Sequence, residues 1–131
     1  TTKGTIALIA IGAMVEPSLE AAKILTNEGI TCRVINARFV KPLDEELIRR
    51  LARETGMIVT VEDSCLAGGF GSAVMEVIQD HHLHWVKILR LGWPDNFIEQ
   101  GSRAQLLAKF HLSAEGIADS IRTYYRTYGV K

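Results

Sequence analysis

The sequence predicts an α/β fold in which a mainly parallel β-sheet lies between two layers of helices. Three observations support this prediction. Short apolar runs alternate four times with segments of helical periodicity, and one more helical segment ends the chain. The first apolar run, residues 5–11, lacks the apolar–polar alternation of a strand with one wet face. Because right-handed crossovers return each helix over the sheet, we expect a three-layer α/β/α sandwich with strand order 2-1-3-4.

The composition is that of an ordinary soluble globular protein. The 131 residues are 47% hydrophobic and 23% charged, which suits one domain, residues 1–131, with a real core. Fifteen basic and fifteen acidic residues cancel, so no global field attracts nucleic acid or an anionic membrane. No apolar run approaches the roughly 20 residues that span a bilayer, and no secretion signal opens the sequence. We expect a cytoplasmic protein whose two cysteines, Cys32 and Cys65, are reduced thiols, buried or half-buried.

The first predicted strand and helix are separated by glycine. The strand covers residues 5–11, and Gly12 ends it. Helical spacing begins at Met14, and Gly29 ends the helix as a left-handed cap. The side chains expected to face the sheet recur at helical spacing: Val15, Leu19, Ala22 and Leu25.

The second unit begins with a strand over residues 30–36, followed by a loop over 38–43. Asp44 suits the N-cap of the next helix, because its carboxylate can accept a hydrogen bond from the first turn. Gly56 ends this helix. Its inward stripe is predicted to be Leu47, Ile48 and Leu51.

The third strand, residues 57–62, is expected to end at the acid pair Glu62 and Asp63. A turn of small residues follows, in which the chain approaches its neighbours closely at three glycines: Gly68, Gly69 and Gly71. Helical spacing resumes at Phe70. The apolar face of this helix is predicted to comprise Phe70, Val74, Val77 and Ile78.

The fourth strand is predicted over residues 85–91, with a proline-containing turn at 92–95 that cannot continue a ladder. Ser102 with Gln105 forms the capping box of a short helix that presents apolar residues at positions 106, 107 and 110. Ser113 caps the last helix. Four side chains of that helix, mainly packing residues, fall at steps of four, three and four: Ile117, Ile121, Tyr124 and Tyr128.

The proposed strand order has two consequences. It brings Gly12 and Met14 next to Glu62 and Asp63, at one crevice on the carboxyl edge of the sheet, where ligands usually bind in such folds. It also leaves the strand at 30–36 as a bare edge, which natural proteins usually cover.

The acid pair is the main candidate for chemistry. One carboxylate could act as an acid, a base or a hydrogen-bond acceptor. The plainer interpretation is that Glu62 accepts backbone N–H bonds from the neighbouring loop. A phospho-acceptor switch domain also needs acids after the first strand, where Gly12 and Ala13 stand instead.

Other candidate sites carry weaker signals. His81, His82 and His84 with Asp80 suggest a metal site, but their spacing does not place three nitrogens around one point. The glycine turn at 68–72 exposes a helix N-terminus that could bind a small anion, although its spacing is not that of a dinucleotide fingerprint. No nucleophile–base set stands out. From the residues alone we assign no catalytic, cofactor-binding or metal-binding residue.

Four segments together resemble one family, the C-terminal domain of 1-deoxy-D-xylulose-5-phosphate synthases, which are transketolase-like enzymes. The first three are shared with C-terminal domains of transketolases and 2-oxo acid dehydrogenase β-subunits, whereas the fourth is typical of the synthases. The acid pair is usually two glutamates in the synthases. The segments are residues 36–44, Val61-Glu62-Asp63, residues 68–72 and residues 92–101 with Pro94, Asp95, Phe97, Ile98 and Gly101.

The resemblance implies that the chain is a fragment of a larger, homodimeric enzyme that uses thiamine diphosphate and Mg²⁺. That enzyme condenses pyruvate with glyceraldehyde 3-phosphate to 1-deoxy-D-xylulose 5-phosphate and CO₂, for isoprenoid and thiamine synthesis. The motifs that bind the cofactor and the substrates lie in domains that are absent here. We therefore expect this fragment to bind neither thiamine diphosphate nor Mg²⁺. The family's leading antiparallel strand, which lies beside the strand at 30–36, is also missing. We therefore expect that edge to be exposed or paired with another copy.

The expected role is a noncatalytic scaffold that packs on the remaining domains and supports dimerisation. One alternative is the C-terminal domain of a transketolase or of a 2-oxo acid dehydrogenase β-subunit that docks a partner protein. Another is a small-anion-binding module. The residues expected at the crevice or at an interface are Gly12, Met14, Glu62, Asp63, Gly68, Gly69, Gly71, Trp93 and Asp95.

Overall fold

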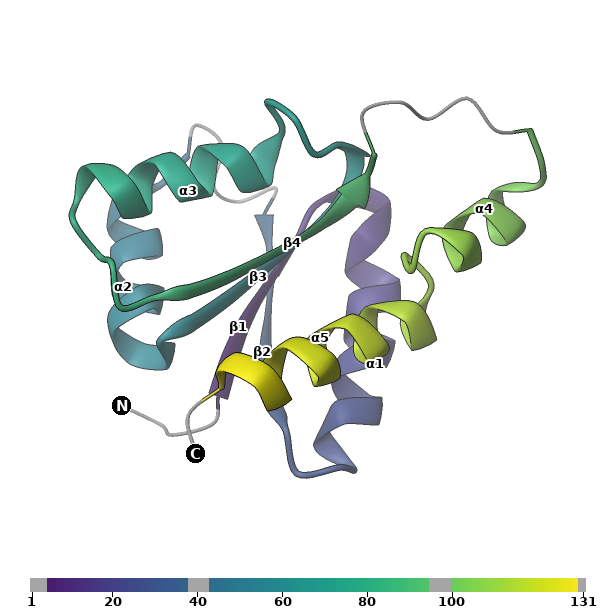
Figure 1. Cartoon of the computed structure of the whole chain (residues 1–131), viewed down its shortest axis with the longest axis horizontal. Helices are drawn as coiled ribbons and strands as arrows, with labels where there is room; N and C mark the ends of the chain where they lie inside the picture. The colour runs from purple at the N-terminus through teal and green to yellow at the C-terminus, as the bar shows by residue number, and fades with distance from the viewer. Residues whose placement is uncertain (1–4, 38–42, 95–99, 130–131) are drawn as a thin grey trace.

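A parallel four-stranded sheet forms the centre of the computed structural model, which describes residues 5–37, 43–94 and 100–129 (Figure 1). All three neighbouring pairs of strands are parallel. The predicted strand order 2-1-3-4 is confirmed. In that order the strands are β2 (Thr31–Asn36), β1 (Thr5–Ala10), β3 (Met57–Cys65) and β4 (Lys87–Trp93).

Helices cover both faces of the sheet, as predicted. One face carries α1 (Val15–Thr26), which follows a short 3₁₀ turn, η1 (Gly12–Met14), and α5 (Ala114–Tyr128). The other face carries α2 (Glu45–Thr55) and α3 (Phe70–Asp80). Figure 1 shows α4 (Arg103–Lys109) set apart from these layers, beyond the end of β4. Among the residues described, no helix combines the length and apolar composition that crossing a membrane requires.

The two helical layers create two separate apolar clusters, one on each side of the sheet. Along β1, Ile6 and Leu8 join the cluster beneath α1 and α5, whereas Ala7 and Ile9 join the cluster beneath α2 and α3. Every residue of β1 is buried. Because neither face of this strand meets water, its sequence shows no polar alternation.

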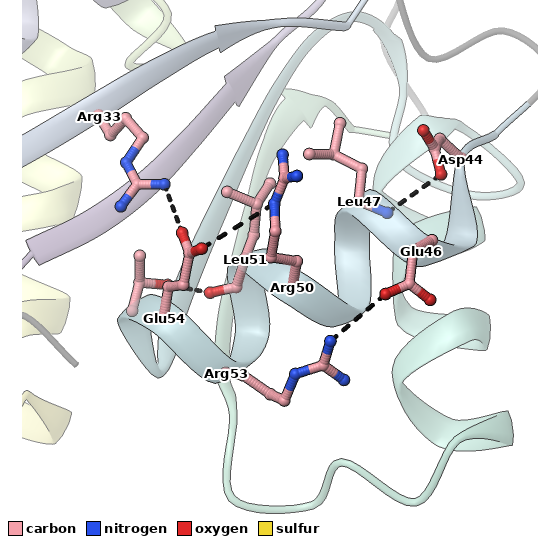
Figure 2. A network of polar contacts seen from close by, with 9 residues as sticks. Arg33, Asp44, Glu46, Leu47, Arg50, Leu51, Arg53 and Glu54 are labelled. Carbon is pink, nitrogen blue, oxygen red and sulfur yellow. Dashed lines mark hydrogen bonds and ion pairs between the residues drawn. The ribbon is translucent and has the colours of Figure 1, made fainter.

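Helix α2 has the ends that its sequence predicts. The Leu47 backbone N–H donates to Asp44 Oδ1 at 3.0 Å, and Gly56 takes a left-handed φ of 72° at the C-terminus. Figure 2 shows the charged outer surface of this helix, where Glu54 receives the guanidinium of Arg33 from β2 at 2.7 Å. This ion pair links the edge strand β2 to the helix layer behind it.

Two strand boundaries differ from the prediction. Strand β3 does not end at Glu62 but continues to Cys65, because pairing with β4 resumes at Cys65 and Trp93 after an irregularity in register. Strand β4 covers Lys87–Trp93 rather than residues 85–91, so Gly92 and Trp93 belong to the strand and not to a turn. Trp85 precedes the strand and is 57% exposed.

The packing face of α1 also differs from the prediction. Leu19, expected to face the sheet, is 47% exposed. The buried residues of α1 are small ones together with one leucine: Ser18, Ala21, Ala22 and Leu25. Small side chains let α1 pack closely against the sheet and against α5, its neighbour on the same face, and Leu19 lies outside these contacts.

Strand β2 is the edge strand that the sequence predicts. Within the described ranges no strand pairs with its outer side, and none of its residues is fully buried. Beside it lies a shallow groove of about 580 Å³, lined among others by Leu19, Cys32 and Val34. Burial raises the pKa of the Cys32 thiol to about 11, so this cysteine stays protonated at neutral pH.

Candidate functional site

Glu62 forms the centre of the candidate site. Its side chain has no exposed surface. One carboxylate oxygen accepts the Phe70 backbone N–H at 2.9 Å and the Ser64 hydroxyl at 2.8 Å, and the other accepts the Gly71 backbone N–H at 2.7 Å. Glu62 is therefore a buried acceptor for the first turn of α3. Glu62 thus accepts backbone N–H bonds, as the plainer interpretation predicts, but the donors belong to the first turn of α3 and not to the loop before it.

Glycines surround this carboxylate because larger residues would collide with it. A Cβ at Gly71 would lie 2.6 Å from Thr60 Oγ1 and 3.0 Å from Glu62 Oε2. A Cβ at Gly69 would lie 2.6 Å from the Cys65 carbonyl oxygen and closer still to Glu62. The same closeness recurs at Gly92 on β4, where a Cβ would be 3.1 Å from Glu62 Cγ. These glycines are needed for tight packing around Glu62, not for their backbone angles.

Glu62 occupies the start of α3, and this argues against the small-anion-binding module. The N–H groups of Phe70 and Gly71, which would have held an external anion, already bind Glu62. Gly68 takes a φ of 71° in the turn before them, where a left-handed residue is required. The small-anion module proposed for residues 68–72 therefore lacks its donors.

Asp63 points to a different set of partners. Its Oδ1 accepts the Trp93 indole N–H at 2.7 Å, and its Oδ2 binds the Arg103 guanidinium at 2.7 Å. The Trp93 hydrogen bond, together with Arg103, holds the pKa of the Asp63 carboxyl below its usual range, against the opposing effect of burial. Trp93 in turn meets the Phe110 ring edge to face at 5.7 Å between centroids. Asp63 thus ties α4 and its flanking residues to the end of the sheet.

The remaining predicted residues do not all join this site. The 3₁₀ turn η1 does lie beside β3, where the Ile11 N–H donates to the Val61 carbonyl at 3.1 Å. Met14, however, is 1% exposed and belongs to the apolar cluster beneath α1 and α5. Gly12 has a φ of 57° and open space around it. Asp95 lies outside the described residues.

The sequence prediction missed Arg90, a half-buried cation of β4. Its guanidinium donates to the Ser72 hydroxyl at 3.1 Å and to the Leu66 carbonyl at 3.4 Å. The Ser72 hydroxyl also donates to the Leu66 carbonyl at 2.9 Å. One signal was available, because Arg90 is a charged residue flanked by apolar residues inside a predicted strand.

Within the described residues, the acidic side chains of this site do not suit a metal ion. Glu62 has backbone and hydroxyl donors on its oxygens, and Asp63 has a side-chain donor on each oxygen. The described ranges contain no group of three or more His, Cys, Asp or Glu that could hold a metal ion. His81 instead lies 3.5 Å from Glu45 on α2, and the rings of His82 and His84 meet edge to face.

The fold and these contacts define a class of protein. The family model of the transketolase C-terminal domain matches residues 2–117, so the chain belongs to the transketolase C-terminal domain family. Within it, the chain is similar to the C-terminal region of 1-deoxy-D-xylulose-5-phosphate synthases. It is 49% identical over 120 residues to synthase 1 of Geobacter metallireducens, covering 92% of this chain and 19% of the relative.

Further relatives agree with this placement. The 1-deoxy-D-xylulose-5-phosphate synthase of Synechococcus sp. strain JA-2-3B'a(2-13) is 48% identical over 98% of this chain and 20% of the relative. A solved structure described as a split gene transketolase, inactive beta4 tetramer, superposes with a TM-score of 0.85 at 33% identity. The match covers 97% of this chain and 41% of that one. The chain thus spans about a fifth of the length of the curated synthases it matches.

Proposed function

We propose that this chain is the noncatalytic C-terminal domain of a thiamine diphosphate-dependent 1-deoxy-D-xylulose-5-phosphate synthase. The observation that carries the proposal is the 49% identity to a synthase over 92% of the chain. The parent enzyme condenses pyruvate with glyceraldehyde 3-phosphate, releasing CO₂. Residues outside this chain hold thiamine diphosphate and Mg²⁺ and carry out the chemistry.

The proposed role of the domain is mechanical. The paired acids fix the carboxyl edge of the sheet, because Glu62 fastens the start of α3 and Asp63 fastens Trp93 and Arg103. A rigid edge of this kind can hold the relative position of the domains packed on it and support a homodimer. We propose that the same enzyme works in the cytoplasm.

A domain exchange tests the proposal. The matching C-terminal region of the Geobacter metallireducens synthase is replaced by this chain, and product formation from pyruvate and glyceraldehyde 3-phosphate is measured. The synthase lacking that region is the negative control. We expect the exchanged enzyme to be dimeric and to keep activity within about tenfold of the parent, a barrier change of about 1.4 kcal/mol. A dimeric, folded exchange enzyme no more active than the deletion would contradict the proposal.

A calorimetric titration tests the noncatalytic part separately. Thiamine diphosphate with Mg²⁺ is added to the isolated chain, and the intact synthase serves as the positive control. We expect saturable heat from the synthase and none from the chain. Stoichiometric binding to the chain would refute the assignment of the cofactor to other residues.

One observation favours a second candidate, the C-terminal domain of a transketolase whose gene is split. The split gene transketolase structure matches 97% of this chain at 33% identity. The synthases are more similar, at 47–50% identity, and are therefore the first candidate. Activity of the exchanged enzyme distinguishes the two candidate functions. Only the synthase candidate predicts that the exchanged enzyme forms 1-deoxy-D-xylulose 5-phosphate.

A further inference from the structure

An open surface cavity outside the acid pair lies between α3 and β4, which is an edge strand among the described strands. Its volume is about 530 Å³, within the range of small-molecule sites. Alternate residues of β4, Ile88 and Arg90, form its floor, because they point to the same face of the sheet. Helix α3 and the turn after it form the wall, to which Ser72, Met75, Glu76, Ile78, Leu83 and Val86 contribute.

The cavity is apolar along most of its length and cationic at one end. Ile78, Leu83 and Val86 are core residues on this side of the sheet, and Met75 is 42% exposed at the surface of α3. At the other end stands Arg90, whose guanidinium bonds only neutral oxygens, those of Ser72 and Leu66. Within the described ranges, no carboxylate lies within ion-pair distance of Arg90.

A half-buried guanidinium with only neutral partners has unused capacity for an anion. Both of these bonds use one guanidinium nitrogen of Arg90, so its remaining N–H groups can bind the two oxygens of a carboxylate side by side. The negative charge of Glu76 on the cavity wall also limits how many negative charges the ligand can carry. Glu76 is exposed on α3 one turn beyond Ser72 and also lines the cavity, so a second negative charge on the ligand would be repelled.

We propose that this cavity binds a small monocarboxylate with an apolar body, its carboxylate on the Arg90 guanidinium and its body against Ile78, Leu83 and Ile88. This site is separate from the contacts of Glu62 and Asp63 and does not rest on the assignment to a synthase.

Titrations of the ¹⁵N-labelled protein with three six-carbon probes test the proposal by amide chemical shifts. Hexanoate carries both the apolar body and one charge, 1-hexanol lacks the charge, and adipate carries a second one. We expect hexanoate to shift resonances of α3 and β4 saturably, with a dissociation constant of about 1 mM. The alcohol and the dicarboxylate should bind at least about tenfold more weakly.

A pair of matched variants tests whether Arg90 binds the carboxylate of hexanoate. Arg90→Gln should weaken hexanoate binding at least about tenfold. Lys87→Gln removes one positive charge from the same strand at a residue that lines a different cavity, and binding should stay within about twofold. Equal binding of hexanoate and 1-hexanol, no saturable shifts, or unchanged binding to Arg90→Gln would each overturn the proposal.

A second pair of variants decides the outcome if Arg90→Gln does not fold. Met75→Trp fills the cavity from the helix surface and should abolish the hexanoate shifts. Leu19→Trp, at a similarly exposed leucine of α1 that does not line this cavity, should leave them unchanged. Retained hexanoate binding in folded Met75→Trp would show that the anion sits elsewhere and would refute the site.

Discussion

At Glu62, a carboxylate with no exposed surface accepts hydrogen bonds from backbone N–H groups and from the Ser64 hydroxyl. Phe70 and Gly71 each give their N–H to a different oxygen of the carboxylate. These groups belong to the first turn of α3, where N–H groups have no partner within the helix and the helix dipole is positive. Strand β3 and helix α3 are therefore joined through one side chain.

Glu62→Gln should lower the free energy of unfolding by about 2–3 kcal/mol. The N–H groups of Phe70 and Gly71 bind different carboxylate oxygens, and the amide replaces one of these oxygens with an NH₂ group that cannot accept. Glu76→Gln, an exposed substitution on the same helix, should change it by less than about 0.5 kcal/mol. Urea unfolding at neutral pH measures both. Equal stability of the two variants would mean that Glu62 does not cap α3.

Asp63 makes stability depend on pH in a defined direction. The Trp93 hydrogen bond and Arg103 hold its folded-state pKa below the ordinary value of 3.8. A lowered pKa contributes stability that is fully present above the unfolded value and is lost as pH falls through the folded value. The carboxylate is 29% exposed, which limits its contribution to about 1 kcal/mol.

Asp63→Asn should therefore cost about 1 kcal/mol of unfolding free energy near neutral pH, and the difference from the parent protein should shrink as the pH falls below 3.8. Denaturant unfolding across this pH range measures the difference. A double-mutant cycle with Trp93→Phe assigns it, since the two losses should not add. A difference that stays constant with pH would contradict the proposed ionic origin.

At the scale of single elements, α2 carries both a strong local contact, its N-terminal cap, and weaker ones, its exposed ion pairs. Asp44 accepts a backbone N–H of the first turn, whereas Glu46 reaches Arg53 at 3.4 Å on the open surface (Figure 2). Glu46 also lies 3.4 Å from Arg49. A cap satisfies a backbone donor that the helix itself leaves unpaired. An exposed ion pair replaces water on two flexible side chains and gains little.

Asp44→Ala should destabilise the protein by about 1 kcal/mol, while Asp44→Asn, which keeps the acceptor oxygen, should cost only a few tenths. Glu46→Gln should change the unfolding free energy by less than about 0.5 kcal/mol despite losing two ion pairs. Thermal and urea unfolding of the three variants give the comparison. A larger loss of unfolding free energy for Glu46→Gln than for Asp44→Ala would contradict the expectation that the cap stabilises α2 more than the exposed ion pairs do.

At the scale of the whole molecule, the sheet has a buried middle and two edges. Strands β1 and β3 have a neighbour on both sides, and the first six residues of β3 and all of β1 are buried. Among the described strands, β2 and β4 each have one neighbour. On β4 the Tyr124 hydroxyl donates to the Ile88 carbonyl at 3.0 Å, which satisfies one backbone group of that strand.

Amide hydrogen exchange should follow this arrangement. We expect the slowest exchange in β1 and β3, and faster exchange at those β2 amides that do not bond to β1, because they face away from the sheet. Exchange measured by NMR on the isolated chain checks the order. Uniform protection along β2 at all protein concentrations would contradict an open edge, whereas protection that rises with concentration would indicate pairing with another copy.

Much of the fold could be predicted because its determinants lie close together in the sequence. Asp44 and Ser102 each cap a helix through a residue three positions later, and the apolar runs specify strands through their length alone. The predictions that failed depend on neighbours. Strand β3 continues past Glu62 only because Trp93 pairs with Cys65, and Leu19 is exposed because α5 and the sheet select the small face of α1.

The sequence by itself determined the parallel α/β architecture, the strand order, the helix caps and the family resemblance, because local periodicity and short motifs encode them. Only the tertiary structure decided what the acid pair does. Adjacent residues of a strand point to opposite faces, so Glu62 turns to the start of α3, whereas Asp63 meets Trp93 and Arg103, which are 30 and 40 positions away. Contacts between residues so far apart form only when the chain has folded, and no spacing in the sequence records them.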